Sequence, residues 1–322
     1  MRSWQSKRRP TLLTTGPGRA IRRRGREPRG TAGPMSLIAR ARLYAEYLVF
    51  RMVAALIMAL PLDLAARLSG GGWRIVAPLL RRHRRALDNL AFAFPETSPA
   101  ERERIARDMW DNLGRTFAEL FHMRRIAREG RIALDPYDRF KAIAEAGPFV
   151  VCTLHMGNWE IASQAGLLFG LPIAGVFQRL TNPYVDAWLF KVRDPFYPGG
   201  LFDKSHATAR ALLRLAREGG YPAFVADLRE SRGVATPFFG RPALSNPFPA
   251  LIARTAGLPL YAARAMRLPG SRFTVRIERV EVPTTGDRHA DVLAATAALH
   301  AQFEDFIREA PEQWMWAHRR WD

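Results

Sequence analysis

The chain has 322 residues, of which 48% are hydrophobic, and this composition is enough to build a sizeable folded core. Its single cysteine, Cys152, excludes an intramolecular disulfide and a cysteine-rich zinc site, and it fits a reducing compartment. The formal charge of +19 suggests a polyanionic partner, but residues 1–34 carry ten Lys or Arg against Glu27 and supply +9 of that charge. Because the charge gathers in this tail and no nucleic-acid-binding motif is recognisable, a nucleic-acid partner is not expected.

Composition divides the chain into three parts. Residues 1–34 are rich in Arg, Gly and Pro without apolar periodicity, so we expect a disordered basic tail. They lack the pattern of a secretory signal, which argues against export, and Met35 is an alternative start of the folded chain. Residues 35–130 are interpreted as a membrane anchor and helical N-terminal region, and residues 131–322 as an α/β domain.

Residues 47–62 form an apolar run that is interrupted only by Arg51. A bilayer span needs about 20 apolar residues, and this run is shorter. Three placements therefore stay open: a short transmembrane helix from which Arg51 reaches the interface, an anchor lying in the interface, and a buried core helix.

A basic cluster and a helix signal follow. Residues 81–85 read Arg-Arg-His-Arg-Arg and lie where anionic headgroups or lipid phosphates would be met, although a solvated helix face is an equal alternative. Ser98, Pro99 and Glu101 have the form of a capping box with proline at the first helical position. Together with apolar residues recurring every three or four positions, they predict an amphipathic helix over 99–125.

From residue 147 onward, short apolar runs alternate with helical patterns. The expected strands are 149–154, 173–177, 223–226, 260–263 and 273–280. The expected helices are 159–169, 184–192, 207–218, 248–256 and 290–308. This alternation predicts an α/β fold with a mixed, largely parallel sheet flanked by helices.

The sharpest motif is His155-Met156-Gly157-Asn158-Trp159-Glu160, which directly follows a predicted strand. Residues five apart on one helix point about 140° apart, so His155 and Glu160 can meet only if His155 sits at the turn before the helix. Glu160 would then fix the imidazole tautomer, and the other nitrogen would act as general base on a bound hydroxyl. The loop's backbone N–H groups or a nearby arginine would stabilise the oxyanion. A chance His-x4-Glu pair is the competing interpretation, and no metal site is expected because no second ligand cluster lies close in the sequence.

Polar residues also follow the later strands, at the edge where α/β sheets bind ligands. The candidates for substrate binding are Arg179, Asp227, Arg229, Arg232 and Arg241. Arginine side chains suit a phosphorylated ligand, although any single one of these arginines could instead serve only to keep the protein surface soluble. Asp227 could equally support another residue of the site or cap a helix. The aromatic loop 237–242 either walls an apolar groove or plugs the core. The tryptophans of 311–321 either lie at a membrane interface or pack against the domain.

Several separated motifs together resemble the lipid A biosynthesis (Kdo2-lipid A lauroyl/myristoyl-type) acyltransferases of Gram-negative bacteria. They occur in order over residues 43–322 as Ala-Leu-Asp-Asn-Leu at 86–90, Ala-Phe-Pro-Glu at 93–96, the His155 to Glu160 block, Asn-Pro at 182–183, Phe-Phe-Gly at 238–240 and the block 310–320. The wider glycerolipid acyltransferases look similar at His155/Glu160, Arg179, 227–229 and 258–260. The chain departs from the family at Phe177-Gln178, where Tyr-Arg is frequent, and at Leu228, where Gln follows Asp, so the roles of Arg179 and Arg229 are less secure.

The resemblance implies an enzyme that transfers an acyl chain from acyl-acyl carrier protein, or acyl-CoA, to a hydroxyl of a phosphorylated glycolipid, the lipid A precursor. It implies a glycerolipid-acyltransferase-like fold, catalysis by His155 and Glu160, no metal or organic cofactor, and a place on the cytoplasmic face of the inner membrane. An acyltransferase acting on another phospholipid or glycolipid acceptor is the alternative.

Overall fold

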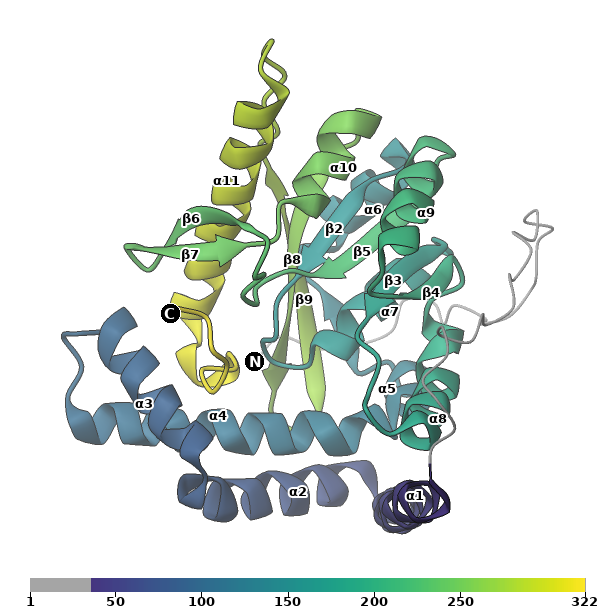
Figure 1. The fold of residues 1–322 in the computed structure, drawn as a ribbon, viewed down its shortest axis with the longest axis vertical. Helices are drawn as coiled ribbons and strands as arrows, with labels where there is room; N and C mark the ends of the chain where they lie inside the picture. The colour runs from purple at the N-terminus through teal and green to yellow at the C-terminus, as the bar shows by residue number, and fades with distance from the viewer. Residues whose placement is uncertain (1–35, 322) are drawn as a thin grey trace, which may run out of the picture.

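The computed structural model describes residues 36–321 and contains a seven-stranded sheet with helices on both faces (Figure 1). The strand order is β1-β9-β8-β2-β5-β3-β4. The bounds are β1 Ile132–Leu134, β2 Val150–Thr153, β3 Ile173–Phe177, β4 Gly200–Asp203, β5 Tyr221–Val225, β8 Leu260–Leu268 and β9 Arg272–Val280. Strands β8, β2, β5, β3 and β4 run parallel, while β9 is antiparallel to β8 and pairs parallel with β1. The predicted mixed, largely parallel sheet is confirmed.

The central strand β2 is buried on both faces, which explains its uninterrupted apolar sequence. Val150 and Cys152 point to one face, into a core shared with α9 (His206–Arg217), α10 (Phe248–Ala256) and α11 (Arg288–Glu309). Phe149 and Val151 point to the other, toward α6 (Tyr137–Ala146) and α7 (Ala162–Leu167). The Cys152 thiol is fully buried, and this burial raises its pKa, so the residue is a core thiol as expected.

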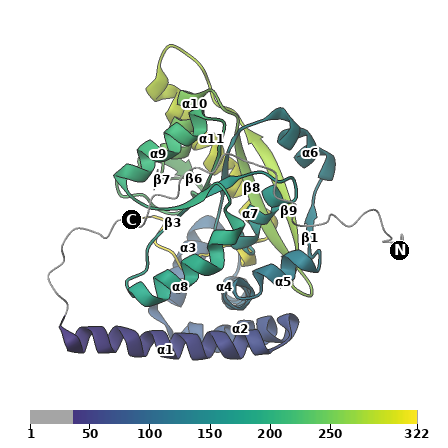
Figure 2. The ribbon, with the colours of Figure 1, turned by 90° about the vertical axis from the view of Figure 1, so that its right-hand side faces the viewer.

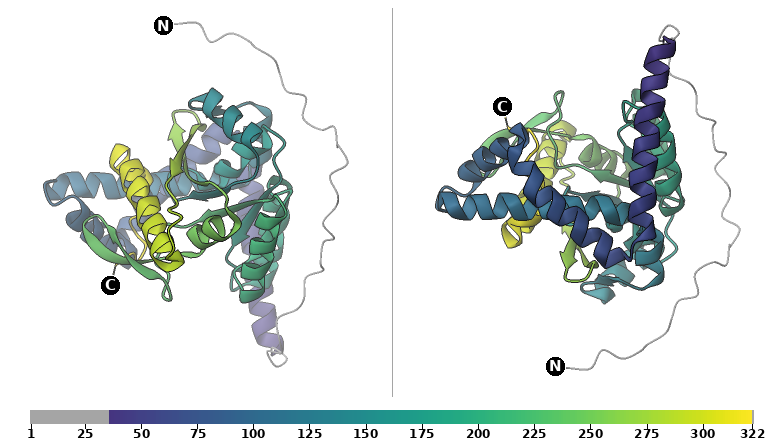
Figure 3. Two further views of the ribbon diagram at one scale, coloured as in Figure 1. Left: turned by 90° about the horizontal axis from the view of Figure 1, so that it is seen from above. Right: turned by 90° about the horizontal axis from the view of Figure 1, so that it is seen from below.

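The helices of residues 37–128 form a layer across one end of the sheet (Figures 1 and 3). They are α1 Leu37–Ala59, α2 Leu62–Val76, α3 Arg81–Ala93, α4 Pro99–Leu120 and α5 Met123–Arg128. Ser98 caps α4, as predicted, by accepting from the Glu101 N–H. The predicted helix 99–125 was too long, because the helix breaks after Leu120 and a new one begins at Met123.

The apolar run 47–62 lies mainly in α1, which crosses the base of the molecule beside α8 (Pro183–Arg193) (Figure 2). Ala54 is the one residue of α1 that is buried, so the core-helix placement is wrong. Among residues 36–321, no helix has both the length and the apolar character needed to cross a membrane. The tail predicted at residues 1–34 lies outside the described residues.

Four strands were absent from the sequence prediction: β1, β4, and the hairpin formed by β6 (Val234–Phe238) and β7 (Arg241–Ser245). The hairpin contains the aromatic loop, whose two phenylalanines, Phe238 and Phe239, are buried and packed among Phe94, Trp314, Trp316 and Trp321, while its other residues are exposed. The loop therefore plugs the core. Trp314 and Trp316 are buried there too, so these tryptophans pack against the domain instead of facing a membrane.

Candidate active site

Two neighbouring strands bring His155 and Asp227 together. In the register of β2 with β5, Thr153 lies opposite Val225. Each strand ends there, and His155 and Asp227 each follow two residues later. Since parallel strands end at the same edge of the sheet, both side chains emerge side by side at the rim where α/β sheets bind ligands.

The imidazole of His155 is held by the carboxylate of Asp227. Nδ1 of His155 lies 2.8 Å from Oδ1 of Asp227, and the His155 backbone N–H donates to Oδ2 at 3.0 Å. The indole Nε1 of Trp314 donates to the same Oδ2 at 2.8 Å. With Nδ1–H directed at a carboxylate, the neutral imidazole carries its lone pair on Nε2, the nitrogen that faces away from Asp227.

Asp227 is fully buried, and burial alone would raise its pKa. The charge of His155 and the hydrogen bonds from His155 and Trp314 outweigh this and lower the pKa to about 2. The carboxylate is therefore ionised at neutral pH, as an orienting partner of a general base must be. The buried carboxylate of Asp227 therefore supports another residue of the site, one of the roles that the sequence left open, and a direct contact of Asp227 with a substrate stays a prediction.

The predicted hydrogen bond between His155 and Glu160 is wrong, because the Glu160 carboxylate binds another residue. Glu160 forms a two-pronged ion pair with Arg193 of α8, with Arg193 Nε 2.9 Å from Oε1 and 3.0 Å from Oε2. The side chain of Asn158 accepts from the Glu160 N–H and begins a short 3-10 helix, Trp159–Ile161, which carries Glu160 away from His155. The two carboxylates therefore serve different purposes, since Asp227 orients the imidazole and Glu160 ties this loop to α8.

His155 lies at the strand-to-helix turn as expected, and Gly157 makes the turn possible. Gly157 has φ +57°, and a Cβ there would lie 2.0 Å from the carbonyl oxygen of Ala265. Its N–H donates to Gln313 O, and its carbonyl accepts from Asn112 and Thr116. Hydrogen bonds to Gln313, Asn112 and Thr116 thus hold the backbone in place two residues after His155.

Backbone N–H groups of this loop were candidates for an oxyanion site, but they are engaged within the protein. Those of His155, Met156, Gly157 and Asn158 donate to Asp227, Leu154, Gln313 and Ala265 respectively. Two aromatic rings flank the imidazole of His155. The centroid of the Trp159 indole lies 4.9 Å from that of the imidazole, and the centroid of the His318 ring lies 6.5 Å from it.

Three of the predicted arginines, Arg179, Arg232 and Arg241, form no described bond with the His155–Asp227 pair. Arg179 pairs with Asp203 of β4 at 2.7 Å, and Arg241 stacks over the ring of Phe92 at 3.7 Å from its centroid. Arg232 is exposed, and Arg229 is half-buried in the loop after β5. No hydrogen bond or ion pair among residues 36–321 joins Arg179, Arg232 or Arg241 to His155. In the same part of the chain, no group of three or more His, Cys, Asp or Glu is placed to hold a metal ion.

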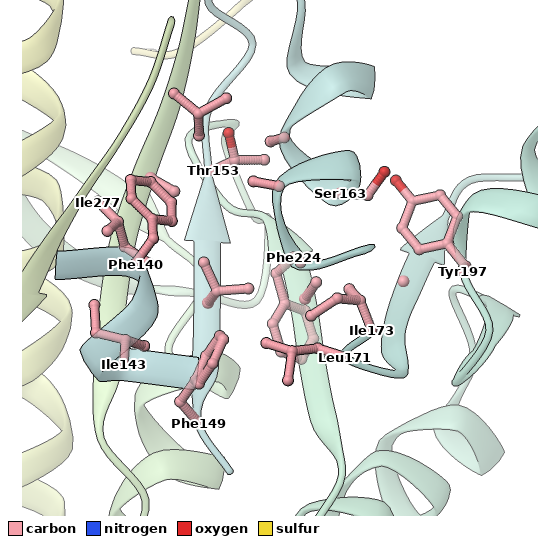
Figure 4. A pocket seen from close by; sticks show the side chains of 18 of the residues that line it. Phe140, Ile143, Phe149, Thr153, Ser163, Leu171, Ile173, Tyr197, Phe224 and Ile277 are labelled. Carbon is pink, nitrogen blue, oxygen red and sulfur yellow. The ribbon is translucent and has the colours of Figure 1, made fainter. Parts of the chain in front are cut away.

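An apolar cavity opens beside the pair, on the sheet face covered by α6 and α7 (Figure 4). The cavity has a volume of about 70 Å³ and is partly open to solvent. It extends along β2 from Thr153 and Trp159, next to His155, to Phe149 and Ile143 at its far end. The four-residue distance from Thr153 to Phe149 corresponds to about 13 Å of strand.

Comparison with known proteins places the sequence of this chain in a family. Residues 38–322 match the model described as bacterial lipid A biosynthesis acyltransferase. The chain is also 22% identical over 251 residues to a lipid A biosynthesis acyltransferase of Haemophilus influenzae, a match that covers 73% of this chain and 74% of the relative.

Proposed function

The chain belongs to the bacterial lipid A biosynthesis acyltransferase family and is an acyltransferase, and from this premise we propose that it moves a fatty acyl chain from acyl-acyl carrier protein to a hydroxyl of a lipid A precursor. The observation that carries the proposal is the hydrogen bond of His155 Nδ1 to the buried, ionised Asp227, which leaves Nε2 as the base.

In this reaction Nε2 of His155 takes the proton from the acceptor hydroxyl as its oxygen attacks the thioester carbonyl carbon. The tetrahedral intermediate then expels the thiolate, which receives the proton from the imidazolium, so an ester and a free thiol result. The negative charge of Asp227 stabilises the imidazolium that exists between the two steps. No covalent acyl-enzyme is required, and Cys152 is buried in the core.

The acyl chain of the donor is assigned to the apolar cavity. Its lining is almost wholly aliphatic and aromatic, and its near end is formed by Thr153 and Trp159 beside His155. A thioester carbonyl held at His155 can therefore direct its tail along β2 toward Phe149. The cavity's apolar character favours burial of a hydrocarbon chain over a polar one.

The helical layer is assigned to the cytoplasmic face of the inner membrane. Helices α1 and α2 expose large apolar side chains in unusual number for a protein surface: Leu37, Ile38, Tyr44, Leu48, Val49, Met52, Val53, Leu56, Met58, Leu68, Trp73, Ile75 and Val76. A lipid surface is the partner that suits such a face when the substrate itself is a lipid.

Vesicle flotation tests the membrane assignment. The double variant Leu48→Asp/Leu56→Asp is expected to lose binding to phospholipid vesicles, because both side chains are more than half exposed on α1. Leu268→Asp/Leu293→Asp, with the same change at exposed leucines elsewhere, should float like the unchanged protein. Equal flotation of all three proteins would contradict the assignment.

The reaction itself is tested by incubating the purified full chain with acyl-acyl carrier protein and a phosphorylated lipid A precursor, and weighing the lipid product. We expect a mass gain of one acyl group with the unchanged protein and none with His155→Ala. Transfer to lysophosphatidic acid but not to the lipid A precursor would select the alternative acceptor. Full activity of His155→Ala would remove the proposed mechanism.

A further inference from the structure

The first turn of α3 concentrates positive charge where a helix already has its positive end. Arg81, Arg82, Arg84 and Arg85 are four of the first five residues of α3, whose first turn contains no acidic residue and no side-chain cap. Cations at a helix N-terminus are unfavourable, and an anion there is favourable. Among residues 36–321, none of these four guanidinium groups has a carboxylate within ion-pair distance, unlike Arg104 and Arg107 on the neighbouring helix α4. His83, predicted with this cluster, is instead buried between Glu103 and Trp110.

Helix α3 is fixed to the segment that borders His155. The amide of Asn89 donates to Trp316 O at 2.8 Å and to His318 O at 3.0 Å, and Arg85 Nη1 reaches Ala317 O at 3.4 Å. In turn, the Met315 N–H donates to the carbonyl of His155 at 3.1 Å. This ladder of bonds holds the arginine-bearing face of α3 close to the site.

His318 links the arginines to the catalytic imidazole. Its ring lies nearly parallel to that of His155, with 25° between the planes, and its Nδ1 is buried without a hydrogen-bond partner among the described residues. Burial lowers the His318 pKa, and the nearby charges of His155, Arg82 and Arg85 lower it further. Arg82 and Arg85 lie seven and four residues before Asn89, on the face of α3 from which Asn89 donates to His318 O.

We propose that Arg82, Arg85 and His318 form a binding subsite for a phosphate group of one of the two substrates, adjacent to the reacting hydroxyl. Guanidinium groups bind phosphate through paired N–H donors, and a phosphate would supply the anion that this helix terminus lacks. The two ring neighbours of His155 then lie toward different groups of the substrates: Trp159 borders the apolar cavity, and His318 lies beside the phosphate subsite. The inference rests on the proposed acyl transfer only for the identity of the ligand. The phosphate belongs either to the acceptor glycolipid or to the arm that carries the thioester.

A binding experiment tests the subsite without any reaction. The full chain is titrated with inorganic phosphate and its Tm is followed, for the unchanged protein, Arg82→Gln/Arg85→Gln and the matched control Arg81→Gln/Arg84→Gln, which removes the same charge from the same helical turn. We expect phosphate to raise the Tm of the unchanged protein and the control, and not that of Arg82→Gln/Arg85→Gln. An equal response of all three proteins, or no response of the unchanged protein, would overturn the subsite.

A kinetic experiment then identifies the source of the phosphate. KM and kcat are measured with phosphorylated and dephosphorylated acceptor, and with thioesters of pantetheine and of its phosphate. Loss of charge-assisted bonds should raise KM for the phosphorylated ligand by about tenfold or more in Arg82→Gln/Arg85→Gln but not in the control. A change confined to the acceptor pair assigns the lipid phosphate, and one confined to the donor pair assigns the thioester arm. Unchanged preference in both pairs would overturn the subsite, whereas absence of transfer by the unchanged protein would overturn the proposed function and leave the Tm result to decide the subsite.

Discussion

Replacement of Asp227 by asparagine tests which carboxylate orients His155. The sequence motif suggests Glu160, whereas the structure shows Asp227. An asparagine oxygen can still accept from the His155 N–H and the Trp314 indole, which both donate to Oδ2. Its NH2 group must then face Nδ1, and a donor facing Nδ1 requires Nδ1 to be unprotonated. The proton moves to Nε2, and the base loses the lone pair with which it would accept the hydroxyl proton.

We therefore expect Asp227→Asn to lower kcat by about 10³-fold, a loss of about 4 kcal/mol of transition-state stabilisation, with a much smaller change in KM. The free energy of unfolding should fall by about 2 kcal/mol, the value that corresponds to a carboxyl pKa of about 2 against an ordinary 3.8. Because this pKa is depressed, that contribution is complete above pH 4 and disappears as the pH falls toward 2.

Glu160→Gln is the matched comparison, since it also exchanges a carboxylate for an amide. It should leave the His155–Asp227 bond intact and keep kcat per folded molecule within about tenfold of the unchanged enzyme. Its effect should be on stability, by about 2 kcal/mol, because Arg193 loses its charged partner in a largely buried position. Steady-state kinetics and thermal unfolding of both variants check this. If Glu160→Gln were the inactive variant and Asp227→Asn kept full turnover, the assignment of the orienting carboxylate would be refuted.

Three further outcomes follow from the geometry. Gly157→Ala should destabilise the fold by about 3 kcal/mol or more in chemical denaturation, since its Cβ would meet a backbone oxygen, whereas Gly130→Ala, at φ +62° with open space around it, should cost about 1 kcal/mol. Burial lowers the pKa of His300 to about 4, and the charge of Arg320 adds to the effect. Because the unfolded chain therefore binds a proton at a higher pH than the folded chain, the free energy of unfolding should fall by about 3 kcal/mol between pH 6.5 and 4. His300→Gln should remove this dependence of the unfolding free energy on pH. Ala223→Phe, in the middle of the cavity, should lower kcat/KM for the longest accepted donor by about tenfold or more while sparing shorter ones, and an unchanged chain-length profile would contradict the acyl assignment.

The sequence allowed the fold class and the position of His155 to be predicted because both depend on local patterns. The apolar run of β2 and the turn residues Gly157 and Asn158 are visible in adjacent positions. The partner of His155 cannot be read from adjacent positions, because its identity depends on which strand lies beside β2. Only the register that places Thr153 opposite Val225 brings Asp227 within reach, from a position 72 residues away.

The strands missed by the prediction have the same origin. Edge strands β1 and β4 are short and gain their stability from β9 and β3, so their own residues contain little alternation. The hairpin β6–β7 was interpreted as a loop because Pro237 and Pro242 interrupt the apolar pattern, yet the two prolines lie opposite each other in a two-stranded ribbon. The sequence also does not show the partners of Arg179 and Arg241, which are Asp203 and Phe92, and the substrate contacts of these two arginines stay predictions.

Nitrogen-15 NMR of the full chain labelled at histidine, with His155→Gln to assign the signal, tests most directly which nitrogen serves as the base. In the neutral imidazole of His155 we expect a protonated Nδ1 and an unprotonated Nε2, and the reverse in Asp227→Asn. A proton on Nε2 in the unchanged protein would contradict the account, because the nitrogen facing the acceptor hydroxyl could then not accept its proton.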